Sequence, residues 1–188
     1  MVFFHGGGNW RGGTYDPSYY GGNFVKNLND KEDCIMVTVN FRLGIFGSLN
    51  LSSLNGYTEE YKDSINLNVL DQIRALEWIN ENIENFGGNP ENVTIFGQSA
   101  GGGAVSALLT IDKAKGLFHK VIAESGNIFN REISIEQSLK NAEKVFDILE
   151  VSSLEELLAI TDDEIRENYQ EELHSTLFHL GTQQRVAD

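Results

Sequence analysis

Hydrophobic residues in the first 130 positions gather in four short runs, at residues 1–4, 35–39, 93–96 and 121–123. Each run is too brief for a helix, and the second and third are rich in β-branched residues, so we predict four strands. Hydrophobicity within the runs is continuous rather than alternating. Continuous runs are typical of strands that are buried on both faces of a sheet.

Between these runs, hydrophobic positions follow a helical period. The clearest case is "VLDQIRALEWINENIENF", where apolar side chains recur every three or four residues, at Val69, Ile73, Leu76, Ile79, Ile83 and Phe86. This spacing predicts a helix with one apolar stripe, and Gly87 and Gly88 mark its end. Strands that alternate with helices predict a mostly parallel α/β sheet.

From Ser134 onward the pattern predicts helices only. The stretches "SIEQSLKNAEKVFDILE" and "SLEELLAITDDEIRENYQEEL" carry apolar residues at helical spacing on an acidic background. Ser134 with Gln137 and Ser153 with Glu156 have the spacing of capping boxes. We interpret residues 1–130 as a partial α/β core and residues 131–188 as an acidic helical segment of the same domain, since 188 residues fit one domain.

Charge and composition exclude several function classes. The net charge is −14, and residues 131–188 alone hold 14 acidic against 5 basic side chains. No basic cluster is present, so we expect no nucleic-acid partner. No apolar run approaches the length of a membrane span, and no basic-then-apolar leader opens the chain. One cysteine, Cys34, lies in a predicted buried strand, and these features favour the cytoplasm while the compartment itself stays open.

The chemistry concentrates at "VTIFGQSAGGGAVSALL", where a predicted strand meets a predicted helix at Ser99. A serine on such a tight turn is held in a strained conformation, so its neighbours two positions away must be small. Gly97 and Gly101 meet that need. The turn places the Ser99 hydroxyl at the start of a helix, where it could attack a carbonyl carbon.

The opening "MVFFHGGGNW" contains a glycine loop that could supply hydrogen-bond donors for the reaction. Attack on an ester carbonyl creates an oxyanion, which needs two or three N–H donors, and each is worth about 2.7–4 kcal/mol. A glycine loop after an apolar strand can turn its main chain toward that oxygen, and "HGGG" is the form such a loop takes in lipases and esterases. The N–H of Ala100 is the expected complementary donor.

These residues resemble one family closely, the type B carboxylesterases of the cholinesterase-like branch of the α/β-hydrolases. The stretch "FGGNPENVTIFGQSAG" is similar to the family's serine-site signature, and "VTVNFRLGIFGSL", "LDQIRALEWINENI" and "LFHKVIAESG" resemble neighbouring segments in the same order. Hormone-sensitive-lipase-like esterases share the "HGGG" loop, but the "FGGNP" turn and the "DQ" helix favour type B.

The resemblance implies an α/β-hydrolase fold, a small carboxylic ester as substrate, and neither cofactor nor metal. It implies that Ser99 is the nucleophile and that Gly7 and Gly8, with Ala100, hold the oxyanion. The chain departs from the family pattern at Gln98, where glutamate is frequent. It departs also at Asn9 and Asn68, and these departures concern the substrate pocket rather than the reaction class.

A serine nucleophile needs a histidine that is oriented by a carboxylate. His5, beside the glycines, is interpreted as a loop anchor, and His119 as an ordinary residue before a strand. His174 and His179 follow Asp162, Asp163 and Glu164 in the required order, but no strand is predicted around them. The family's acid and histidine lie further along than this chain extends, so we expect both to be missing.

The chain therefore looks like the middle part of an esterase. Two alternatives stay open: a non-catalytic cholinesterase-like interaction module, and an inactive truncated gene product. Glu124 and Ser125, at the end of the fourth predicted strand, are expected to lie near Ser99, with a structural role favoured over a role beside the site.

Overall fold

The computed structural model describes residues 1–27, 33–126, 132–169, 171–173 and 185–186. It divides the chain into two compact units. The first unit consists of Met1–Arg42 and Val69–Asn130, and the second of Leu43–Asn68 and Arg131–Asp188. Within the described residues, no helix combines the length and the apolar character that crossing a membrane requires.

The first unit is built on a four-stranded sheet in the order β2-β1-β3-β4. Its strands are β1 (Val2–Phe4), β2 (Val37–Val39), β3 (Thr94–Gln98) and β4 (Lys120–Glu124). All three pairings are parallel, with Phe4 opposite both Val39 and Gly97, and Gln98 opposite Glu124. The predicted parallel α/β sheet is thus confirmed, and all four predicted strands are present. The carboxyl ends of β1 and β3 meet at one edge of the sheet.

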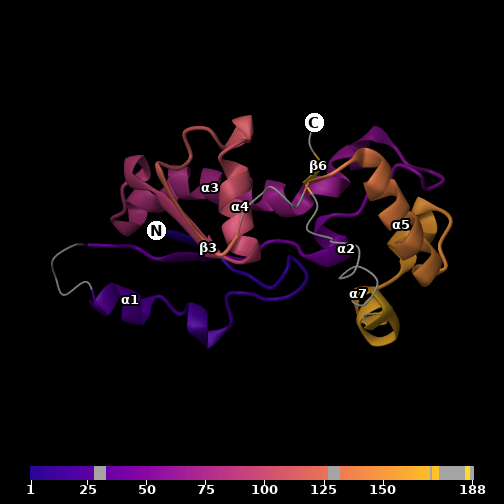
Figure 1. Ribbon diagram of the computed structural model, residues 1–188, viewed down its shortest axis with the longest axis horizontal. Helices are drawn as coiled ribbons and strands as arrows, with labels where there is room; N and C mark the ends of the chain where they lie inside the picture. The colour runs from indigo at the N-terminus through magenta and orange to yellow at the C-terminus, as the bar shows by residue number, and fades with distance from the viewer. Residues whose placement is uncertain (28–32, 127–131, 170, 174–184, 187–188) are drawn as a thin grey trace. The chain divides into compact units, whose positions relative to one another are not determined.

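Helices surround this sheet, and Figure 1 shows α3 and α4 on the same side of β3, with α1 on the opposite side. Besides α1 (Gly22–Asn27), α3 (Leu67–Asn82) and α4 (Ala100–Leu108), the unit has 3-10 turns at Pro17–Tyr19, Ile83–Phe86, Pro90–Asn92 and Asp112–Ala114. Helix α4 packs against β1, β3 and β4. The predicted helix over residues 69–86 is therefore confirmed as far as Asn82, and its last turn tightens before Gly87 (φ 81°) ends it.

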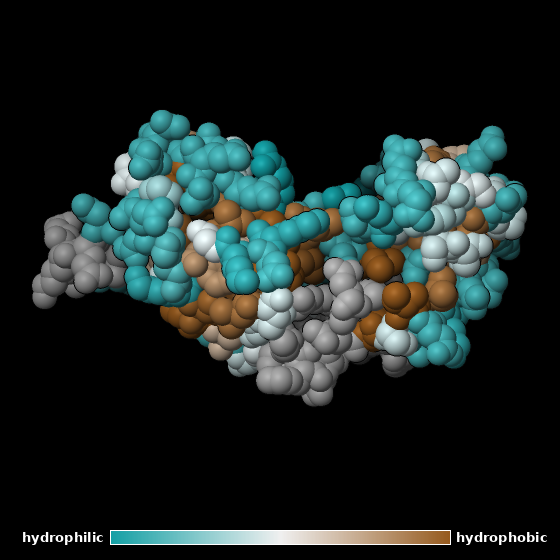
Figure 2. All heavy atoms as spheres, turned by 90° about the horizontal axis from the view of Figure 1, so that it is seen from above, coloured by the Kyte–Doolittle hydropathy of each residue, from teal (hydrophilic) through white to brown (hydrophobic). Residues whose placement is uncertain are grey.

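Burial is uneven across the sheet. All three residues of β1 are buried, whereas β4 is mostly exposed and its Ile122 keeps 45% of its surface accessible. The expectation that every strand is buried on both faces is wrong for β4 and holds only in part for β2, and these are the two edge strands of the described sheet. Apolar surface of this kind appears as brown areas among the teal ones in Figure 2.

The second unit is mainly helical. Its elements are α2 (Gly44–Gly47), a 3-10 segment (Glu59–Asn66), α5 (Ile135–Leu149), α6 (Leu154–Ala159), α7 (Asp162–Glu164), a π-helical turn (Ile165–Tyr169), and the strands β5 (Glu132–Ile133) and β6 (Arg185–Val186). Helix α5 buries one face that includes Ala142, Val145, Phe146 and Leu149. The strands β5 and β6 pair in parallel, so the prediction of helices alone is incomplete.

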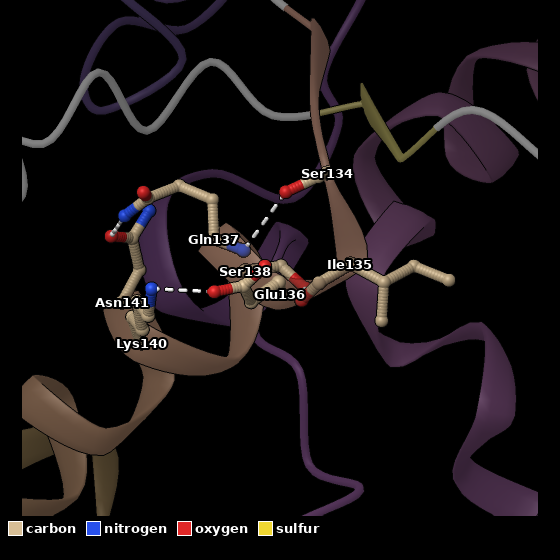
Figure 3. A network of polar contacts seen from close by, with 7 residues as sticks. All are labelled: Ser134, Ile135, Glu136, Gln137, Ser138, Lys140 and Asn141. Atoms are coloured by element: carbon tan, nitrogen blue, oxygen red, sulfur yellow. Dashed lines mark hydrogen bonds and ion pairs between the residues drawn. The ribbon is translucent and has the colours of Figure 1, made fainter.

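Helix starts in this unit differ from the predictions in two places. Ser134 accepts a hydrogen bond from the Gln137 N–H (3.1 Å), but the Gln137 side chain donates to Asn141 (2.9 Å) instead of returning to Ser134, as Figure 3 shows. The predicted second helix is also broken: Ile160 is extended, and a capping box at Thr161 starts a new helix there. The predicted capping box at Ser153 is confirmed.

Candidate functional site

Ser99 stands between β3 and α4, at the carboxyl end of a strand whose Ile95 and Gly97 are buried. Its backbone dihedrals are φ 57° and ψ −117°, which place a residue with a side chain in a region that glycine prefers. Such strain persists only where the surroundings hold it, and it is frequent at functional sites. The Ser99 side chain is half-buried and stands at the start of α4.

Close packing on either side explains why glycines flank Ser99. A Cβ on Gly97 would lie 2.5 Å from the carbonyl carbon of Gly101 and 2.7 Å from the carbonyl oxygen of Phe4. A Cβ on Gly101 would overlap that same Phe4 oxygen. The predicted need for small residues at both positions is confirmed, and β1 is the neighbour that imposes it.

The main chain of Ser99 is anchored at both ends. Its N–H donates to the carbonyl oxygen of Glu124 (2.8 Å), and its own carbonyl accepts from the Gly103 N–H (2.9 Å). Glu124 therefore lies beside Ser99 as expected, and it makes this contact through its backbone. Ser125, with φ 51°, carries the chain away from the strand end.

The glycine loop runs directly against this turn. Because Phe4 pairs with Gly97, the residues that follow each strand emerge side by side. A Cβ on Gly6 would lie 2.9 Å from the Gln98 carbonyl oxygen and 3.4 Å from the Cβ of Ser99. The first glycine of the triplet is thus in contact with the serine turn.

Gly7 and Gly8 form a tight turn beyond that contact. Both have positive φ values, 107° and 67°, and a Cβ on Gly7 would overlap the carbonyl oxygen of Arg11. The Gly7 carbonyl accepts from the N–H groups of Trp10 and Arg11 (3.1 Å each). The turn therefore leaves the N–H groups of Gly7 and Gly8 without an acceptor among the described residues.

The described histidines do not sit where a base for Ser99 is needed. His5 is 2% exposed, and its Nδ1 is 2.7 Å from the Gly6 carbonyl oxygen, which matches the predicted loop anchor. His119 accepts from the Val93 N–H (3.2 Å) and precedes β4, so it lies at the opposite end of the strands from Ser99. His174 and His179 lie outside the described residues.

The candidate acids belong to the second unit. Asp162, Asp163 and Glu164 form the short helix α7, and the Glu164 carboxylate accepts from the N–H (2.9 Å) and the hydroxyl (3.0 Å) of Thr161. These hydrogen bonds lower the pKa of Glu164, the backbone N–H contributing most. Glu164 thus caps a helix.

Two contacts at the site could not be singled out in the sequence. Gly6 touches the serine turn, although only the second and third glycines were assigned a function. Gly126 packs against the Ser99 carbonyl, which a Cβ on Gly126 would overlap. The sequence shows that both positions are glycines, but the residues that they approach become clear only from the pairing of the strands.

Comparison with known proteins agrees with this geometry. The model of the family described as "Carboxylesterase family" matches residues 1–184. The chain is 45% identical to the para-nitrobenzyl esterase of Bacillus subtilis (strain 168) over 152 residues, which is 81% of this chain and 29% of that protein. It is 46% identical to carboxylesterase 1D of Rattus norvegicus over 128 residues, which is 67% of this chain and 20% of that protein.

Solved structures show the same likeness. Carboxylesterase EST55 of Geobacillus stearothermophilus superposes with a TM-score of 0.80 at 36% identity, over 96% of this chain and 35% of that one. A thermophilic pNB esterase gives a TM-score of 0.81 at 35% identity, over 100% of this chain and 38% of that one. The parallel sheet with its helices is thus part of an α/β-hydrolase fold, and the chain spans about a third of these relatives. The chain belongs to the carboxylesterase family.

Proposed function

We propose that this chain carries the nucleophile and the oxyanion hole of a carboxylic ester hydrolase. Ser99 is the nucleophile, and the N–H groups of Gly7, Gly8 and Ala100 bind the oxyanion. The observation that carries this proposal is the strained Ser99 turn packed against a glycine loop. The substrate class, a small carboxylic ester, follows from family membership.

The proposed reaction proceeds through an acyl-enzyme. The Ser99 Oγ attacks the ester carbonyl carbon, its proton passes to a histidine base, and the carbonyl oxygen becomes an oxyanion. Collapse of the tetrahedral intermediate breaks the bond to the alcohol, which leaves with the proton from the histidine. Water then repeats the sequence on the acyl-enzyme and releases the acid. The N–H donors lower the barrier of both halves because charge develops on the same oxygen.

The proposal places the histidine and its carboxylate outside these 188 residues. Supporting this, His5 is buried with its Nδ1 held by Gly6, and His119 lies at the far end of the strands. The chain also matches less than a third of the para-nitrobenzyl esterase. We therefore expect the chain alone to hydrolyse esters very slowly or not at all.

A chimera tests the proposal directly. This chain replaces the matching stretch of the Bacillus subtilis para-nitrobenzyl esterase, so that the missing residues come from the relative. We expect hydrolysis of p-nitrophenyl acetate, loss of kcat by at least about 10⁴-fold in Ser99→Ala, and covalent labelling by a fluorophosphonate at Ser99. The control is Ser106→Ala, because Ser106 lies on α4, the helix that follows Ser99, and its hydroxyl donates to the Gly102 carbonyl (2.8 Å).

Two results would overturn parts of the proposal. A folded chimera that hydrolyses no ester and takes no label would favour the alternative of a non-catalytic interaction module. Robust hydrolysis by the 188-residue chain itself, abolished by His174→Ala or His179→Ala, would place the base within this chain.

A further inference from the structure

His5 is the most confined polar side chain near the glycine loop. It follows β1 directly and is 2% exposed. Its ring stacks on Phe41 with 4.6 Å between the ring centres and 14° between the planes. On another side, a Cβ on Gly12 would lie 2.7 Å from the His5 Nδ1, so only glycine leaves room for the ring there. The imidazole is held on several sides and cannot turn freely.

The hydrogen bond of His5 selects one protonation form of the ring. Nδ1 is 2.7 Å from the carbonyl oxygen of Gly6, and a carbonyl can only accept, so Nδ1 must carry the hydrogen. Nε2 is buried without a hydrogen-bond partner among the described residues. A hydrogen on Nε2 would therefore be a buried donor without an acceptor, which is costly. The contact therefore places the ring hydrogen of His5 on Nδ1.

The carbonyl that His5 holds belongs to the same planar peptide group as the Gly7 N–H. In a trans peptide the C=O and the N–H point in opposite directions, so fixing one fixes the other. Residues on both sides of this group are glycines, whose backbone rotates easily, and an unheld group could turn over at little cost. We propose that His5 is a positioning residue that, through Nδ1–H and the Gly6 carbonyl, aims the Gly7 N–H toward the substrate oxyanion.

The identity of the group that the Gly7 N–H binds rests on the proposed function, whereas the orientation of this N–H does not. Two substitutions of His5 distinguish a positioning role from a packing role. The side-chain amide of asparagine can place an N–H where His5 carries Nδ1–H, whereas phenylalanine fills the ring space and stacks on Phe41 but donates nothing. If His5 is a positioning residue, His5→Asn should preserve the orientation of the Gly7 N–H and His5→Phe should not. If His5 only fills space, His5→Phe should preserve this orientation and His5→Asn should not.

The test is NMR spectroscopy of the 188-residue chain. Nitrogen shifts of the His5 ring should show a protonated Nδ1 and an unprotonated Nε2. Residual dipolar couplings of the Gly7 N–H, which report its direction, should agree between the native chain and His5→Asn. In His5→Phe the Gly7 coupling should change or average toward zero, while couplings of β1 and β3 stay the same and show that the sheet is intact.

Two results would overturn the proposal. One is a native His5 ring protonated at Nε2, which needs no variant to detect. Another is a Gly7 coupling in His5→Phe equal to the native one. Neither measurement involves ester hydrolysis. An inactive Ser99 would therefore count against the proposed function but not against the positioning role of His5. A failed NMR test would count against the positioning role but not against the proposed function.

Discussion

Gly126 packs against the main-chain carbonyl of Ser99 so closely that a Cβ on Gly126 would overlap that oxygen and lie 2.6 Å from the nitrogen of Gly103. The chain leaving β4 thus supports the serine turn from outside. This contact joins the Glu124 carbonyl, which accepts from the Ser99 N–H (2.8 Å), in fixing the turn against β4.

Gly126→Ala should therefore disturb the serine turn, because backbone atoms on both sides cannot move apart cheaply. We expect the free energy of unfolding to fall by about 3 kcal/mol, measured by urea denaturation, and the chimera to lose ester hydrolysis. Gly116→Ala is the control: Gly116 has φ 80° but no atom within 4 Å of an added Cβ, so only the backbone cost of about 1 kcal/mol applies. Equal effects of the two changes would contradict this account.

The ion pair between Arg42 and Asp71 should matter more than the other ion pairs of the first unit. The Asp71 carboxylate accepts from the Arg42 N–H (2.9 Å), Nε (2.8 Å) and Nη2 (2.6 Å). We expect Asp71→Asn to lower the free energy of unfolding by about 1 kcal/mol. The matched control, Glu77→Gln in the exposed pair with Arg74, should cost only a few tenths of a kcal/mol, roughly.

The same carboxylate predicts a pH dependence. Burial by itself would raise the pKa of Asp71, but the hydrogen bonds from Arg42 and its charge lower the pKa below its usual value. The stability from this group is present above the ordinary aspartate pKa and is lost as pH falls through the lowered pKa of the folded state. Urea denaturation at several pH values should show that the free energy of unfolding falls less steeply toward acidic pH in Asp71→Asn than in the native chain. An equal slope in both would contradict this role of Asp71.

The capping box of α7 should stabilise the second unit. Thr161 accepts from the Glu164 N–H (3.2 Å), and the Glu164 carboxylate returns to Thr161. We expect Thr161→Ala to cost about 1 kcal/mol and to raise the pKa of Glu164 toward its ordinary value, observed by NMR titration. Thr58→Ala is the control, because Thr58 also precedes a helical segment but makes no side-chain cap. Matching losses would rule out the box as the cause.

A buried polar pair ties α5 to the preceding segment of its unit. Asn50 and Ser138 are 6% and 3% exposed, and the Asn50 Nδ2 donates to the Ser138 hydroxyl (2.8 Å), which in turn donates to the Ile135 carbonyl (2.7 Å). Ser138→Ala leaves a buried Asn50 donor unsatisfied and should cost about 1–3 kcal/mol. In a double-mutant cycle with Asn50→Ala the two losses should be strongly non-additive; additive losses would show that the pair is not coupled.

The serine turn was predictable from sequence because its requirements are local. Gly97, Ser99 and Gly101 lie within five residues, between a strand and a helix whose patterns are clear. The exposure of Ile122 was not predictable in the same way, since it depends on which strand lies at the edge of the sheet. Nor was the break at Ile160, because the acidic residues beyond it keep a helical spacing while Thr161 starts a new cap. The contacts of His5 and Gly126 depend on loops that only strand pairing brings together.

The position of β1 between β2 and β3 has a consequence for synthesis of the chain. Val2 pairs with Val37 on one side and with Ile95 on the other, so β1 emerges from the ribosome long before its second neighbour exists. A central strand of this kind cannot be completed until Gly97 is available. During that interval the apolar side chains of Phe3 and Phe4 lack their partners on β3, and such transiently exposed apolar surface is prone to aggregation. The sheet that brings the glycine loop to Ser99 therefore cannot form until β3, and with it the serine turn, has been synthesised.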